Sequence, residues 1–354
     1  MDDFTLGKGA IVNGLDAADN GVVFTAGAYN DLTGVTHAIV QRSLDGGGTW
    51  NTVLDQPGAT ARAWSVRVGG SGLVFATATL RSTRNSAWND WATFRSTDGG
   101  TTWSRVDTLT APNFKANPNA VVEDSAGRVF VGGNYGDSKN ADHFLTRRSL
   151  DGGTSWTTVD DQAPGGFNVV TSLAATPSGV FAAGHLRNVW TVRRSVNGGA
   201  TWATVDSFLA APAGSWSHAS GIAADANGNL YVTGQSQFRV HKVTDLHWIT
   251  RKSTDNGATW STVDDVVLGT NPYGRSVTVD ALGHLFASGY YTSGSAYHWV
   301  TRTSVDAGVT WVTSDDLIGI GYAAASDAVG NTFTGGQTSQ TDGTHGIVRK
   351  LAAQ

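Results

Sequence analysis

The chain has 354 residues, of which 40% are hydrophobic and 15% charged, and a formal net charge of −5. This composition can bury a core, so it excludes a disordered chain. No run approaches the roughly 18 apolar residues of a membrane span, so none is expected. The net charge is negative and gives no reason to expect the basic face that nucleic-acid binding needs, so no nucleic-acid partner is expected. There are 45 Gly and 13 Trp, and Glu123 is the single glutamate among 29 acidic residues. Gly, Asp and Thr favour turns and strands, which predicts an all-β protein.

The chain contains no cysteine. This excludes a disulfide framework, a thiolate metal site and a cysteine nucleophile. We expect no cofactor and assign no metal ligand. The first residues, Met1-Asp2-Asp3-Phe4, include neither a basic segment nor an apolar stretch, so no signal peptide is expected in this chain. We expect an extracytoplasmic or secreted protein whose signal peptide is absent from the sequence.

One eight-residue segment with the pattern S-x-D-x-G-x-T-W recurs six times, at 43–50, 96–103, 149–156, 195–202, 253–260 and 304–311. Its acidic position holds Asp45, Asp98, Asp151, Asn197, Asp255 and Asp306, and its last position holds Trp50, Trp103, Trp156, Trp202, Trp260 and Trp311. Successive tryptophans are 46 to 58 residues apart. That period suits one unit of four antiparallel strands.

The sixth unit illustrates the expected strands. Residues 276–280 and 285–290 alternate as two strands, 298–302 form a third, and 311–315 follow the repeated segment as a fourth. The Asp carboxylate can accept backbone N–H bonds in the turn, Gly tolerates positive φ, and Trp can pack between neighbouring sheets. We therefore predict that the repeated segment is a structural turn.

The chain ends after three strands of a seventh unit, and an Asp-Asp segment like those that end other units stands at the N-terminus. We predict a single domain, 1–354, that is a seven-bladed β-propeller of four-stranded antiparallel blades, with the last blade closed by the N-terminal strand. Such closure leaves no open edge, and we expect a monomer. The predicted blades are about 9–56, 62–109, 117–162, 168–208, 218–266, 274–317, and 321–351 plus 1–7.

The repeated segments resemble the Asp-box, or BNR, repeat of the sialidase-like β-propeller superfamily. The resemblance implies that the boxes are scaffold on the face opposite the active site. Sialidases of this superfamily carry an Arg triad, an F/Y-R-I-P motif and a Tyr/Glu nucleophile pair. This chain has no R-I-P, and its Glu123 falls in the turn between the first two strands of a blade, on the box side. The sialidase catalytic set is therefore not carried over.

Candidate site residues come from the innermost strands, where one equivalent position near the mouth of the axis differs from blade to blade. It is occupied by Asn13, Trp64, Asn119, Val170, Ser220, Arg275 and Tyr322. A purely structural ring would reuse one small residue, so we predict that these unlike side chains bind a ligand. Further candidates are Trp88, Trp216 and Tyr273 in the variable loops of the same face, together with Arg62 and His218. Arg67 and Asp16, three residues further along, are predicted to form a buried ion pair that plugs the channel.

Histidines recur at the start of the third strand of a blade, as His37, His143, His247, His298 and His345. Spread around a ring, they would be too far apart to share one metal ion. We predict that they form hydrogen bonds from blade to blade. Large aromatic residues recur at the next position and are predicted to pack between blades: Trp91, Phe144, Trp190, Trp248 and Trp299.

Two classes of function remain open. We favour a non-enzymatic propeller that binds a glycan or a protein through its loop-rich face. The alternative is a carbohydrate-active enzyme, first a polysaccharide lyase using Arg62, His218, Tyr273, Arg275 and Tyr322. A glycoside hydrolase would need a pair of the loop acids Asp31, Asp90, Asp137, Asp142 and Asp245. A resemblance to the Asp-box propeller that assists photosystem II assembly rests on fold alone.

Overall fold

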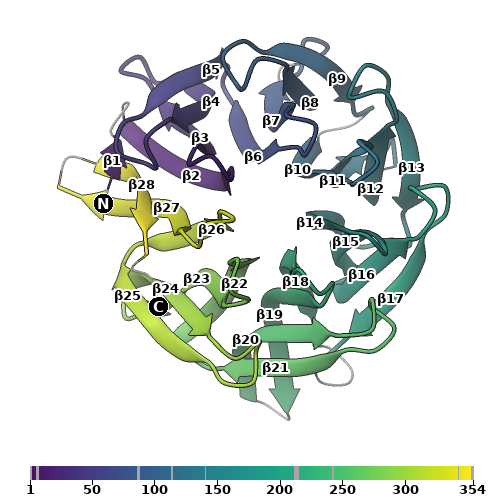
Figure 1. Ribbon diagram of the computed structural model, residues 1–354, viewed down its shortest axis with the longest axis vertical. Helices are drawn as coiled ribbons and strands as arrows, with labels where there is room; N and C mark the ends of the chain where they lie inside the picture. Colours follow the sequence, from purple (N-terminus) through teal and green to yellow (C-terminus); the bar gives the residue numbers. More distant parts are fainter. Residues whose placement is uncertain are drawn as a thin grey trace.

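The structure is a computed structural model that describes residues 2–4, 8–85, 88–112, 115–139, 141–210, 215–240, 243–341 and 343–351. These residues form seven antiparallel sheets arranged radially about a central axis (Figure 1). The predicted all-β, seven-bladed propeller is confirmed. Within the described ranges, no helix is long and apolar enough to cross a membrane.

Each blade runs outward from the axis through consecutive strands. The innermost strands are β2 (Lys8–Ala17), β6 (Arg62–Val68), β10 (Ala116–Glu123), β14 (Asn168–Thr176), β18 (Ser217–Ala224), β22 (Thr270–Val279) and β26 (Ile320–Ser326). The second strands are β3 (Val23–Asn30), β7 (Val74–Arg81), β11 (Val129–Gly136), β15 (Gly179–Leu186), β19 (Leu230–Val240), β23 (Leu285–Ser293) and β27 (Thr332–Gln340). The third strands are β4 (Thr36–Ser43), β8 (Asn89–Ser96), β12 (Asp142–Ser149), β16 (Val189–Ser195), β20 (Val243–Ser253), β24 (Ala296–Ser304) and β28 (Gly343–Lys350). The outer strands are β5 (Asn51–Pro57), β9 (Ser104–Thr110), β13 (Thr157–Gln162), β17 (Ala203–Phe208), β21 (Ser261–Val266) and β25 (Val312–Ile318).

The seventh blade takes β26, β27 and β28 from the C-terminal end of the chain. The backbone of β1 (Asp2–Phe4) lies antiparallel to β28, with Asp2 opposite Val348 and Phe4 opposite Gly346. Figure 1 shows this segment beside the yellow C-terminal blade. Residues 5–7 of the predicted last blade lie outside the described residues.

Each box is a turn held by the side chain at its acidic position, which is an aspartate in five boxes and Asn197 in the fourth. In the first box Asp45 Oδ1 accepts hydrogen bonds from Ser43 Oγ at 2.7 Å and from the backbone N–H of Thr49 at 2.8 Å. These hydrogen bonds lower the pKa of Asp45 to about 2. Gly46 and Gly47 follow with φ of 67° and 97°, a conformation that disfavours other residues. The box residues thus have a structural role in the turn.

The boxes also link neighbouring blades. A Cβ on Gly100, in the second box, would lie 2.5 Å from the ring of Phe24 in the first blade. Arg42 of the first blade donates to the Gly99 carbonyl at 2.7 Å. The box tryptophans pack into the apolar layers between blades, as Trp103 does between the first and second. Close approach and positive φ together explain why this turn needs glycine.

The aromatic residues of the third strands pack across the blade boundaries, as predicted. Trp190 and Trp248 are fully buried. A Cβ on Gly234, in the next blade, would lie 2.7 Å from the Trp190 ring, and one on Gly289 would lie 3.0 Å from Trp248. Each tryptophan therefore fills a space that the following blade leaves open with a glycine.

Arginine–aspartate pairs, four of them buried or nearly so and one partly exposed, join the blades at five junctions, and they were not predicted from the sequence. At the junction of the third and fourth blades, Arg193 Nε and Nη2 donate to Asp160 at 2.6 and 2.9 Å. The other four pairs are Arg147–Asp107, Arg251–Asp206, Arg302–Asp264 and Arg349–Asp315. At the junction of the first and second blades the equivalent positions hold Leu54 and Phe94, which lie in one apolar cluster.

Candidate functional site

A β-bulge in every innermost strand places one extra residue at the same level of the axis. The bulged residues are Asn13, Trp64, Asn119, Thr171, Ser220, Arg275 and Tyr322. A bulge re-aims the side chain of its extra residue, which here faces the axis. In six blades a glycine on the second strand lies opposite. A Cβ on Gly289, for example, would lie 2.0 Å from the Tyr273 carbonyl oxygen.

These seven residues line a cavity of about 570 Å³ that follows the axis between the innermost strands. Six of them are the predicted candidates Asn13, Trp64, Asn119, Ser220, Arg275 and Tyr322. The seventh prediction, Val170, was wrong by one residue. The register shift in β14 falls between Val170 and Ser172, so Thr171 is the bulged residue and Val170 is fully buried between blades.

Three of the bulged side chains tie adjacent blades together. Asn13 Nδ2 donates to the Ala63 carbonyl and Asn119 Nδ2 to the Val170 carbonyl, each at 2.8 Å. Thr171 Oγ1 is 2.9 Å from the Ala219 carbonyl oxygen. Each acceptor belongs to the residue just before the next bulge. These side chains have a structural task, which leaves Trp64, Ser220, Arg275 and Tyr322 as the residues free to meet a ligand.

The end of the axial cavity at the level of the bulged residues, opposite the box side, is called the mouth below. Arg62 and Trp64 form one half of it. The Arg62 guanidinium carbon lies 4.6 Å from the centre of the Trp64 ring, and Arg62 Nη2 donates to Asn13 Oδ1 at 2.6 Å. Trp64 Nε1 donates to Thr79 Oγ1 at 2.7 Å, which fixes the indole plane. Arg62 also borders a smaller cavity of about 280 Å³, lined in part by Tyr29 and Asn30.

Arg275 and a group of tyrosines form the other half. The Arg275 guanidinium carbon lies 4.8 Å from the Tyr273 ring centre, 5.3 Å from that of Tyr322 and 5.8 Å from that of Tyr290. The rings of Tyr273 and Tyr290 are stacked with centroids 5.9 Å apart. Tyr290 was not predicted, although the Tyr290-Tyr291 pair on the second strand was a visible signal.

The charged and titratable side chains in the two halves of the mouth interact with one another. Burial lowers the pKa of Arg62, and the positive charge of Arg275 lowers it further while Tyr322 opposes the shift. Burial raises the pKa of Tyr322, and both arginines counter it. Within the described part of the chain neither Arg62 nor Arg275 forms an ion pair. The mouth therefore holds two mutually repelling cations above aromatic rings.

The remaining candidates lie elsewhere. His218 and Trp216 belong to a stack of four rings at the junction of the fourth and fifth blades. The ring centroids of His218 and Trp216 are 4.6 Å apart, those of His218 and His185 3.9 Å, and those of His185 and Phe167 5.0 Å. Trp88 lies in the loop before β8 and does not line the axial cavity. Of the residues proposed for a lyase, His218 is thus packed in this ring stack, whereas Arg275 and Tyr322 line the axial cavity.

The box-side end of the channel is polar. Arg67 Nη1 pairs with Asp16 Oδ1 at 3.0 Å, as predicted, but its side chain is 52% exposed, so the pair is not buried. Glu123, the last residue of β10, accepts from Ser71 Oγ at 2.7 Å. This end therefore has its charges and hydrogen bonds matched, unlike the mouth.

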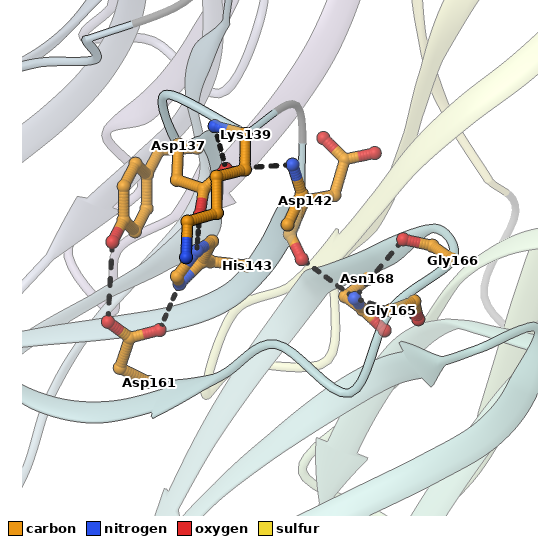
Figure 2. A network of polar contacts seen from close by, with 10 residues as sticks. Asp137, Lys139, Asp142, His143, Asp161, Gly165, Gly166 and Asn168 are labelled. Carbon is orange, nitrogen blue, oxygen red and sulfur yellow. Dashed lines mark hydrogen bonds and ion pairs between the residues drawn. The ribbon is translucent and has the colours of Figure 1, made fainter.

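The third-strand histidines form hydrogen bonds within a blade, so the predicted blade-to-blade bonding was wrong for those with described partners. His143 Nδ1 lies 2.5 Å from Asp161 Oδ1 on the outer strand of its own blade (Figure 2). The Tyr135 ring packs against that of His143, with centroids 4.2 Å apart. Burial and the Asp161 carboxylate raise the pKa of Tyr135 to about 12. His37, His247 and His298 pair likewise with Asp55, Asp265 and Asp316. The reason is geometric, because adjacent antiparallel strands lie closer than adjacent blades.

Two of the loop acids weighed for hydrolysis, Asp31 and Asp137, are held by hydrogen bonds within their own loops. Asp137 accepts from the backbone N–H of Lys139 (Figure 2) and from that of Ala141. Asp31 does the same for Thr33 and Val35. Among the described residues there is no group of three His, Cys, Asp or Glu side chains placed to hold a metal ion.

Comparison with known proteins supports the repeat and the fold. A family model described as BNR/Asp-box repeat matches residues 94–105, within the second predicted unit. The chain thus carries the Asp-box repeat in a seven-bladed β-propeller, as the resemblance implied. No significant match to a curated protein is found.

Several solved structures share the fold at low identity. YCF48 bound to D1 peptide is 17% identical, with a TM-score of 0.60 over 99% of this chain and 96% of that one. The Penicillium chrysogenum alpha-L-arabinanase complexed with arabinobiose is 13% identical, with a TM-score of 0.55 over 80% and 92%. A PL25 ulvan lyase bound to a GlcA–Rha3S oligosaccharide is 10% identical, with a TM-score of 0.54 over 99% and 96%. These likenesses concern the fold, which serves both binding and catalysis.

Proposed function

We propose that the mouth of the axial cavity binds an acidic glycan without cleaving it. The observation that carries the proposal is a pair of arginines without a carboxylate partner among the described residues: Arg275 lines the axial cavity, and Arg62 lies close enough for the two charges to interact. A buried or half-buried cation without an anion is costly, and a uronate or sulfate group on the ligand would supply that anion. Guanidinium groups suit this task because their planar fork binds oxyanions with two parallel hydrogen bonds.

The aromatic rings at the mouth support a glycan. Trp64, Tyr273, Tyr290 and Tyr322 are all partly exposed. Flat rings with a polar edge pack against the apolar faces of sugar rings while their polar atoms stay hydrated. The cavity is large enough for one or a few sugar residues, since ligand sites in proteins commonly span about 300–1,000 Å³. We further propose that the protein acts as a monomer outside the cytoplasm, where acidic polysaccharides are available to it.

A protein ligand is the second candidate, because the propeller that aligns over nearly this whole chain is described as bound to a peptide. An acidic peptide would use the same arginines but would not need several flat rings. Lyase activity has less support, since the His218 ring, its candidate base, is packed between those of His185 and Trp216.

Binding to an array of acidic and neutral glycans tests the proposal. The wild-type protein should be retained by uronate-rich or sulfated glycans and not by neutral ones of equal length. Trp64→Ala should weaken retention by about 30-fold or more, the loss expected for a central aromatic contact. Arg275→Met, which keeps the stem but removes the charge, should abolish it. Arg67→Met, at the other end of the channel, should bind like wild type.

Three results would go against this account. Equal retention of neutral and acidic glycans would remove the role of the arginines. Release of unsaturated uronates or new reducing ends during the incubation would establish an enzyme. Retention by acidic peptides but by no glycan would favour the protein ligand.

We also propose that β1 locks the ring by acting as the outer strand of the seventh blade. Its backbone register with β28 supports this role. Removing residues 1–7 would expose the hydrogen-bonding edge of β28 to solvent. We expect the melting temperature to fall by several degrees in calorimetry. A truncated protein that melts at the wild-type temperature would show that the ring closes without this strand.

A further inference from the structure

Ser220 departs from the pattern by which bulged side chains join neighbouring blades. The equivalent Asn13, Asn119 and Thr171 each bond to a carbonyl of the next innermost strand. Ser220 is 8% exposed, lines the axial cavity, and its Oγ has no hydrogen-bond partner. An unpaired buried hydroxyl costs free energy, so its retention at this position calls for a partner that the chain itself does not provide.

The next bulged residue around the ring is Arg275, and it too is incompletely paired. Its Nε is buried without a hydrogen-bond acceptor, and its guanidinium is surrounded by tyrosine rings instead of carboxylates. The strands that carry the two residues approach closely, because a Cβ on Gly221 would lie 2.9 Å from Ser276 Cα and 3.1 Å from the Arg275 carbonyl oxygen. Ser220 and Arg275 therefore lie on neighbouring innermost strands whose backbones are in contact, both line the cavity, and each has a buried donor without an acceptor.

We propose that Ser220 and Arg275 form an oxyanion subsite that takes one carboxylate or sulfate group, while Arg62 and Trp64 contact the rest of the ligand. This inference rests on the proposed function, and it assigns the charged group of the glycan to one place in the ring. Carboxylates and sulfates are acceptors only, so they match two groups that act here as donors. A neutral hydroxyl would leave the arginine charge unbalanced.

Calorimetric titration with two small probes, inorganic sulfate and methyl glucuronide, tests the subsite. Wild-type protein should bind one equivalent of at least one probe, and the comparison distinguishes sulfate from carboxylate preference. Ser220→Ala should weaken that binding at least about tenfold, as expected for loss of a hydrogen bond to a charged group. Ser220→Thr, which restores a hydroxyl as in the preceding blade, should keep it. Ser65→Ala, at another cavity-lining serine, is the matched control and should bind like wild type.

The outcomes separate the subsite from the wider proposal. If Ser220→Ala binds both probes and acidic polysaccharide as tightly as wild type while Arg62→Met loses the polysaccharide, the subsite is wrong and glycan binding stands. If wild type binds acidic polysaccharide but neither probe, the subsite is again wrong. If wild type binds no acidic glycan at all, the proposed function fails first. Melting curves of every variant exclude misfolding as the cause of a loss.

Discussion

Asp206→Leu should lower the free energy of unfolding by about 3–5 kcal/mol, the cost of leaving a buried charge without its partner. Asp206 and Arg251 are 7% and 8% exposed, and two hydrogen bonds of 2.9 and 3.1 Å join them across the junction of the fourth and fifth blades. Without the carboxylate, the buried Arg251 guanidinium has no acidic partner. Chemical denaturation followed by tryptophan fluorescence measures the change.

The chain itself contains the replacement for this pair. Leu54 and Phe94 occupy the equivalent positions at the junction of the first and second blades and pack in one cluster. The double variant Asp206→Leu/Arg251→Phe should therefore recover most of the stability lost by the single one. Asp55→Leu, at an exposed acid of an outer strand, is the control and should cost about 1 kcal/mol or less. A double variant no more stable than the single one would show that the junction depends on charge instead of packing.

Acid should destabilise the fold through the stacked histidines His185 and His218. Burial lowers the pKa of His185 to about 3, with His218 adding to the shift, and burial lowers the pKa of His218 to about 4. Both groups would titrate near 6.5 in the unfolded chain. The unfolded state thus binds more protons below pH 6.5, and each unit of pKa difference corresponds to about 1.4 kcal/mol. Stability is fully present above pH 6.5 and declines as the pH falls toward 4.

The measurement is the unfolding free energy at pH 7.0, 6.0 and 5.0 for wild type and for His185→Phe/His218→Phe, which keeps the ring stack. Wild type should lose several kcal/mol over this range and the double variant much less. His37 gives an internal contrast, since Asp55 raises its pKa and its contribution is present below pH 6.5 and lost at higher pH. Parallel profiles for the two proteins would refute the burial of neutral imidazoles.

Most of the fold could be predicted from the repeated segment. Six boxes at a regular period, followed by a further unit of three strands, predicted seven blades, because the same turn recurs with its second glycine in all six copies and its aspartate in five. The ring at the mouth was predictable for the same reason, since an otherwise repeated position that varies is easy to see in an alignment of the units. The alignment of the units selected Val170 instead of Thr171, because a bulge changes the register by one residue and leaves no signal in the sequence.

The partners of individual side chains were harder to predict from the sequence. The histidines were assigned to the wrong partners, because the sequence does not reveal which of two neighbouring surfaces a side chain meets. The Arg251–Asp206 type of pair was missed although Arg recurs on third strands and Asp on outer strands, since the partners lie in different blades and 33 to 45 residues apart. Burial of His185 likewise depends on Phe167, in the loop before β14, and on His218 from the next blade.

The most direct test of the central claim is a crystal structure of the protein soaked with an acidic oligosaccharide that it retains. The account predicts density at the loop-side mouth of the axial cavity, with the charged group on Arg275 and a sugar ring against Trp64 or Tyr322. Density only on the box side or on the outer loops near His143, with the mouth filled by solvent, would contradict it.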